Sequence, residues 1–190
     1  MVKRGFTLIE LLISIGVLGI ALTVTSGVLL SVIRSSQRQK VIAEVERNGE
    51  SVMTYIEKMA TKALSVNCKP LTGVLSSCNG VNTNEISLSQ SSGVLFIGLK
   101  QGPFVSCNGS TQKNNFVFAT SDDSSVNANS DPVKLTNDSV NGVNIRDLSF
   151  YLTSGNPSYI TVTMTVEDSN CSSWNVSRQF QSFMTVRGTY

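Results

Sequence analysis

Histidine is absent from this chain of 190 residues. Its absence excludes imidazole as a general acid or base, Ser-His and Cys-His nucleophile activation, and zinc sites that contain histidine. The sequence also contains no phosphate-binding loop and no G-x-S-x-G nucleophile motif. We therefore expect that the protein is not an enzyme and has no resident cofactor.

Charged residues are also scarce, at 15% of the chain against about 25% in ordinary soluble domains. The net charge is only +2, so bulk charge gives no reason to expect nucleic-acid binding. Serine, threonine and asparagine together form about a third of the chain, and these residues favour turns, loops and strand surfaces. Disorder is the competing interpretation of such polar tracts, but the apolar and β-branched runs among them favour a folded β-rich domain.

A long apolar stretch follows the first few residues. Leu11 to Ile33 is a run of 23 uncharged, mostly apolar residues. About 20 such residues cross a bilayer as a helix, so the run predicts a transmembrane segment. A buried core helix and a cleaved secretory signal are the alternatives. The run is longer than the about 7–15 apolar residues of a signal, and core helices of this length usually have a polar face.

Two features of the apolar segment indicate helix packing. Glu10 is its one acidic residue, and a carboxylate in hydrocarbon suggests a function unless it reaches the nearby interface. Gly19, Thr23, Gly27 and Ser31 recur every four residues and form one ridge of small side chains, which allows close approach of helix backbones. A chance run of small residues is the alternative for this ridge.

The N-terminus resembles a known processing motif. The opening MVKRG is a short basic leader ending at Gly5, and it is followed by FTLIE, with Phe6 first and Glu10 fifth. This arrangement resembles the type IV prepilin and pseudopilin motif. The resemblance implies that residues 1–5 are a leader removed by a prepilin peptidase, and that the new amine of Phe6 is methylated.

The resemblance also implies partners and a location. The partners are other pilin or pseudopilin subunits, the prepilin peptidase and an inner-membrane assembly platform. Basic residues flank both sides of the apolar run, so the resemblance, not charge, places the C-terminal domain outside the cytoplasmic membrane. After assembly the chain would belong to a cell-surface pilus or a pseudopilus. Glu10 would pair with the Phe6 amine of a neighbouring subunit, since an unpaired buried charge is costly.

Residues 34–66 predict an amphipathic continuation of the 6–33 helix. Their apolar positions repeat every seven residues, at Val45, Val52, Met59 and Val66 and at Ile42, Ile56 and Ala63. Cys68 and Pro70 mark the expected end of the helix. Gly49 is the weakest position within it, because glycine destabilises a helix by about 1 kcal/mol relative to alanine. A coiled coil is the competing interpretation of the heptads, although only three to four are present.

Residues 67–190 predict a β-rich, pilin-like globular domain. The runs with strand character are Glu85–Ser89, Val94–Lys100, Phe116–Ala119, Val143–Leu152, Tyr159–Glu167 and Val176–Arg187. The predicted fold is therefore α+β, with one long helix packed on an antiparallel sheet. The segments Val143–Phe150, Tyr159–Glu167 and Phe183–Arg187 also resemble the final hairpin of J-type minor pseudopilins, which implies a minor subunit.

Four cysteines are present: Cys68, Cys78, Cys107 and Cys171. None forms a C-x-x-C pair, which disfavours a zinc site, and an even count in an exported domain predicts two disulfides. Of the three pairings we favour Cys68–Cys78 with Cys107–Cys171, because the first closes a short loop after the helix.

An oxygen-rich segment is the one candidate metal site. Asp123, Asn127, Asn129 and Asp131 alternate in the run SDDSSVNANSD and could supply oxygens to calcium. The segment lacks the glycine and glutamate of an EF-hand loop, so a solvated surface loop is the alternative.

The sequence predicts a structural subunit of a type IV pilus or of a pseudopilus like that of type II secretion. The alternative is a single-span surface anchor whose β domain binds DNA, a glycan or another surface. Cleavage after Gly5 separates the two, because an ordinary anchor keeps its leader.

Overall fold

A computed structural model of the chain describes residues 7–68, 82–107, 110–121, 132–139, 142–153, 158–169 and 174–186. By their internal contacts the residues fall into two compact units, Met1–Lys40 and Val41–Tyr190. The first unit contains the beginning of one long helix. The second contains the rest of that helix and all the strands.

Helix α1 extends from Leu8 to Ala60 without interruption at Gly27 or Gly49. The sequence predicted helix as far as Val66, and this was wrong. The turn after Ala60 tightens, because the Ala63 amide donates to the Ala60 carbonyl at 3.1 Å. The Leu64 amide then donates to the Ser89 carbonyl at 2.8 Å, so pairing with a strand replaces the helical hydrogen bonds.

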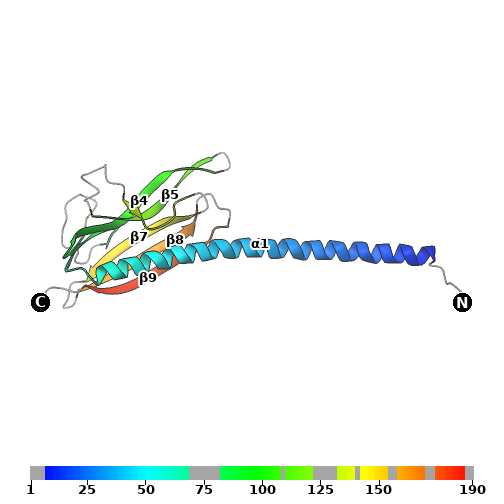
Figure 1. Ribbon diagram of the computed structural model, residues 1–190, viewed down its shortest axis with the longest axis horizontal. Coiled ribbons are helices and arrows are strands. Elements are labelled where there is room, and N and C mark those ends of the chain that lie inside the picture. The colour runs from blue at the N-terminus through cyan, green and yellow to red at the C-terminus, as the bar shows by residue number, and fades with distance from the viewer. Residues whose placement is uncertain are drawn as a thin grey trace. The chain divides into compact units, whose positions relative to one another are not determined.

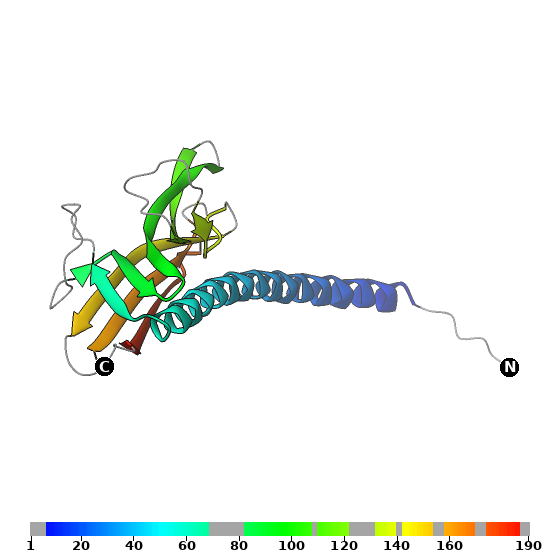
Figure 2. The same cartoon turned by 60° about the vertical axis from the view of Figure 1, so that its left-hand side comes forward.

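Among the described residues, all the strand pairs are antiparallel. Their bounds are β1 Ser65–Cys68, β2 Asn82–Thr83, β3 Glu85–Gln90, β4 Gly93–Cys107, β5 Ser110–Thr120, β6 Val133–Lys134, β7 Val143–Thr153, β8 Ser158–Asp168 and β9 Ser177–Val186. One sheet has the order β1-β3-β4-β5-β6 and the other β2-β7-β8-β9. Figures 1 and 2 show β7, β8 and β9 side by side along the second half of α1.

All six predicted strands are present, and the α+β class is confirmed. Several features differ from the prediction. The strands form two sheets, where one was expected, and the short strands β1, β2 and β6 were not predicted. β5 begins at Ser110, before the predicted Phe116, and β4 continues past Lys100 to Cys107. The pairing of β4 with β5 shifts in register between Gln101 and Phe104. This irregularity lets β4 continue past the Gly102-Pro103 pair, which would otherwise end the strand.

A single hydrophobic core lies between α1 and the two sheets. In β8 the residues Ile160, Val162, Met164 and Val166 are at most 1% exposed, while the threonines between them are only half-buried. This is the period-two pattern of a strand with one face in the core. The predicted helix stripe is confirmed as far as the helix extends. Its buried members in α1 are Val45, Val52 and Ile56, and Ile42 and Met59 pack partly against the same core. Ala63 and Val66 also contact this core, but they lie after the end of α1.

Gly49 lies on the buried stripe of α1 and receives the ring of Phe180 from β9. A Cβ added at Gly49 would collide with the far edge of that ring. Packing against Phe180 therefore requires glycine at position 49. The sequence alone showed only the unfavourable helix propensity of this glycine. Beside it, the buried side chain of Asn48 accepts a hydrogen bond from the Asn137 amide at 3.1 Å and joins α1 to the segment before β7.

We expect Gly49→Ala to lower the free energy of unfolding by about 1–2 kcal/mol. Overpacking against Phe180 costs about 1–3 kcal/mol, which outweighs the gain of about 1 kcal/mol in helix propensity. Urea unfolding of the full chain in detergent, followed by fluorescence of the single tryptophan Trp174, measures the change.

A second background tests the cause of that loss. In a Phe180→Ala chain the ring is gone, so Gly49→Ala should stabilise the protein by the propensity term alone. The exposed helix position Ala43 provides the matched control, because Ala43→Gly changes propensity without touching the core. Destabilisation by Gly49→Ala in both backgrounds would contradict the packing account.

Candidate processing and assembly segment

The first turn of α1 is held by Thr7. The Glu10 amide donates to the Thr7 carbonyl at 3.2 Å and to Thr7 Oγ1 at 3.4 Å, so Thr7 is the N-cap residue. Glu10 is then the third helical residue, where a carboxylate interacts favourably with the helix dipole. This capping role was not predicted from the sequence, although the spacing T-x-x-E is the signature of a capping box.

The apolar side chains from Leu8 to Ile33 are solvent-exposed. The large hydrophobic residues among them are between 45 and 79% exposed. Within α1 the most apolar stretch has a mean hydropathy of 2.3, and none of it is buried. Among the described residues this is the one helix whose length and composition suit a membrane span. Such a surface needs lipid or other apolar helices around it, so the segment is suited to anchor the chain in a membrane.

Four hydroxyl groups in this apolar stretch donate hydrogen bonds to the helix itself. Ser14 Oγ donates to the Glu10 carbonyl at 2.8 Å, and Thr25 and Ser26 donate to the carbonyls four residues earlier at 2.7 and 2.8 Å. Thr23 donates to the Ile20 carbonyl at 2.8 Å. Their donors are thus satisfied within the helix, which removes the cost of exposing them to hydrocarbon.

The four small residues of the predicted ridge lie in α1 and are exposed. A Cβ added at Gly19 or Gly27 would have no other atom within 4 Å, so the backbone there is accessible to a neighbouring helix. The geometry agrees with a packing surface. The role of Gly19, Thr23, Gly27 and Ser31 in assembly stays a prediction.

The comparison with protein families addresses this segment directly. Residues 1–26 match the family model described as the prokaryotic N-terminal methylation motif. The chain carries the signature of type IV prepilins and pseudopilins. Proteins with this methylation motif are structural, are processed by a prepilin peptidase and assemble with other pilins. No curated protein and no solved structure matches the chain.

Several predicted residues lie outside the described part of the chain. They are Gly5 and Phe6 of the methylation motif, the calcium candidates Asp123, Asn127, Asn129 and Asp131, and the cysteines Cys78 and Cys171. Cys68, at the end of β1, is disulfide-bonded and 2% exposed. The pairing of the four cysteines and the calcium site stay predictions.

Proposed function

We propose that this chain is a structural subunit of a type IV pilus or of a type II secretion-like pseudopilus. In this proposal a prepilin peptidase cuts after Gly5 and Phe6 becomes the methylated N-terminus. The apolar stretch of α1 holds the chain in the cytoplasmic membrane with residues 41–190 outside, and later packs against the same segment of neighbouring subunits. The resemblance of β7–β9 to J-type pseudopilins favours a minor subunit.

One observation carries the proposal. The methylation motif includes the start of an apolar stretch of α1 that is exposed from Leu8 to Ile33 and in which four hydroxyl groups are satisfied. A plain membrane anchor needs the apolar stretch alone. The glycine before the cut, the phenylalanine after it and the glutamate at the fifth mature position add nothing to anchoring, but they are what processing and assembly require.

The mature N-terminus tests the proposal. Mass spectrometry of the chain from its native membrane should find a first residue Phe6 carrying one N-methyl group. Gly5→Leu should leave the leader in place, because a side chain there obstructs the close approach of the peptidase to the backbone. Gly16→Ala, a substitution in open space within the apolar stretch, is the matched control and should be processed normally.

An intact Met1 in cells with an active prepilin peptidase would overturn the proposal. The chain would then be a simple anchor, and the binding properties of its β domain to DNA, glycans or other surfaces would become the question of function.

A further inference from the structure

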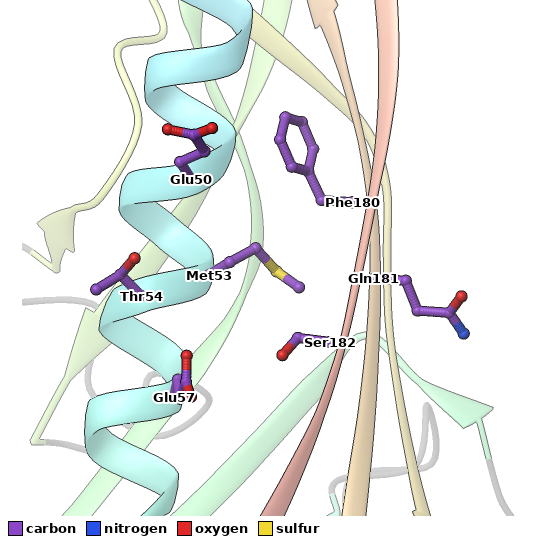
Figure 3. A pocket seen from close by; sticks show the side chains of 7 residues that line it. All are labelled: Glu50, Met53, Thr54, Glu57, Phe180, Gln181 and Ser182. Atoms are coloured by element: carbon purple, nitrogen blue, oxygen red, sulfur yellow. The ribbon is translucent and has the colours of Figure 1, made fainter.

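A groove of about 340 Å³ lies within the second unit, between α1 and β9. Glu50, Met53, Thr54 and Glu57 line it from the helix, and Phe180, Gln181 and Ser182 line it from the strand. Figure 3 shows that Met53 and Ser182 point toward each other across the groove, while Gln181 points away from the helix. At one end the ion pair between Arg178 and Glu46, at 3.4 Å, joins the two elements.

The strand wall of the groove is a sheet edge. β9 is the last strand in the order β2-β7-β8-β9. It pairs with β8 from Ser177, which lies opposite Glu167, to Val186, which lies opposite Ser158. Within the described residues, no other strand pairs with it and no backbone hydrogen bond links it to α1. On the side away from β8, alternate amides and carbonyls of this ten-residue strand therefore have no strand partner among the described residues, and an added strand would find its hydrogen-bond partners there.

The helix wall carries negative charge. Glu50 and Glu57 are both exposed, and in the described part of the chain no cation pairs with either carboxylate. They are seven residues apart, which is about 10.5 Å along a helix. Residues on the same face of a strand recur about every 6.7 Å, so two long basic side chains of one strand reach both carboxylates.

The face of β9 that is turned away from α1 is apolar along the same part of the strand. Phe183 is 71% exposed there, beside Thr161 of β8, and Tyr151 of β7 lies opposite the same threonine. A strand added to β9 would place one set of side chains toward the glutamates and the alternate set beside Phe183. The two faces thus define the required partner: basic residues on one side and apolar residues on the other.

We propose that the groove binds an extended segment of another protein, in which basic and apolar residues alternate, as an additional strand on β9. Backbone hydrogen bonds to the edge supply the affinity, and Glu50 and Glu57 select the basic face. A second copy of β9 is excluded as the occupant by charge, because it would bring its own Glu50 and Glu57 against the first pair. This inference goes beyond the proposed function, since the groove lies in residues 41–190 and needs no filament.

The probe is an eight-residue blocked peptide of alternating lysine and valine, labelled for fluorescence anisotropy. We expect it to bind the full chain in a non-ionic detergent, and raising the salt from 0.15 to 0.5 M should weaken binding severalfold. Glu50→Lys with Glu57→Lys should weaken it at least about tenfold. Asp147→Lys, an exposed charge reversal on β7, should leave it unchanged and controls for peptide bound to the micelle.

Two N-methylated forms of the peptide test strand addition itself. Only every second amide of a paired strand faces its neighbour, so methylation of one alternate set should abolish binding and methylation of the other should preserve it. Three results would each overturn the inference. They are equal binding of the two methylated forms, equal binding of the peptide to the unchanged chain and to the Glu50/Glu57 double variant, and no binding up to millimolar peptide. None of these results bears on cleavage after Gly5.

Discussion

Glu10→Ala is expected to reduce incorporation of the chain into filaments at least about tenfold, while cleavage after Gly5 continues. In the proposed filament the Glu10 carboxylate pairs with the Phe6 amine of a neighbour in apolar surroundings. Removing one partner of such a pair leaves a buried charge without compensation and costs about 3–5 kcal/mol. The measurement is the ratio of processed chain in sheared filaments to processed chain in the membrane fraction.

The N-cap position of Thr7 supplies a competing explanation, which two further variants separate. Glu10→Gln keeps the capping-box residue type but removes the charge, whereas Thr7→Val removes the cap but keeps the charge. The pairing account expects Glu10→Gln to fail as severely as Glu10→Ala and Thr7→Val to assemble nearly normally. Recovery of assembly by Glu10→Gln would show that the glutamate acts by capping its own helix.

Asn114→Ala is expected to lower the free energy of unfolding by about 3–5 kcal/mol. The side chain is fully buried in β5, and its amide group donates to the Asp138 and Ser139 carbonyls at 3.1 and 3.0 Å and to Ser169 Oγ at 3.0 Å. Truncation removes these hydrogen bonds, worth about 0.5–1.5 kcal/mol each, and takes the donor from the carbonyl of the buried Asp138, which costs about 1–3 kcal/mol more. The Ser139 carbonyl keeps the Gly142 amide as a donor. The expected loss is a large part of the about 5–15 kcal/mol that stabilises a typical domain.

Urea unfolding in detergent measures the Asn114 effect, and Asn84→Ala is its control. Asn84 is exposed and is also replaced by alanine, so its loss should stay within about 0.5 kcal/mol. A loss of less than 1 kcal/mol for Asn114→Ala would show that water or neighbouring groups replace its hydrogen bonds without cost.

Local patterns predicted much of the fold because the core is built from regular periods. The alternation in β8 and the seven-residue stripe of α1 each follow from one buried face, and both are visible without a partner. The pairing of β7 with β8 and of β8 with β9 joins runs that are neighbours in the sequence.

The features that sequence missed depend on distant residues. The end of α1 is set by the Ser89 carbonyl, which accepts a hydrogen bond from the Leu64 amide, 25 residues earlier in the chain. The two sheets are joined by side chains such as Asn115 of β5, whose amide group donates to the Ile145 carbonyl of β7 at 3.1 Å. Gly102, in the irregular part of β4, is buried where a Cβ would lie 2.6 Å from Asp138 Oδ2. None of these partners is recognisable from its own neighbourhood in the chain.

The candidate site divides in the same way. The methylation motif is contiguous, so the sequence identified it and the family comparison agrees. The groove beside β9 joins residues 50–57 to residues 180–182, which are more than 120 positions apart. Nothing near its two glutamates in the sequence indicates a strand edge, so the groove was not predicted.

The self-contained hydrogen bonding of Ser14, Thr23, Thr25 and Ser26 has a consequence for how such a chain is stored and used. When the segment exchanges lipid for the apolar flanks of other helices, none of these four bonds has to break or form. Lipid and neighbouring helices are then nearly equivalent surroundings for the segment. The difference in free energy between these two surroundings depends mainly on close packing and on the single charge of Glu10. In the proposed filament, subunits with such a segment could therefore move from the bilayer into the filament and back without a large change in free energy.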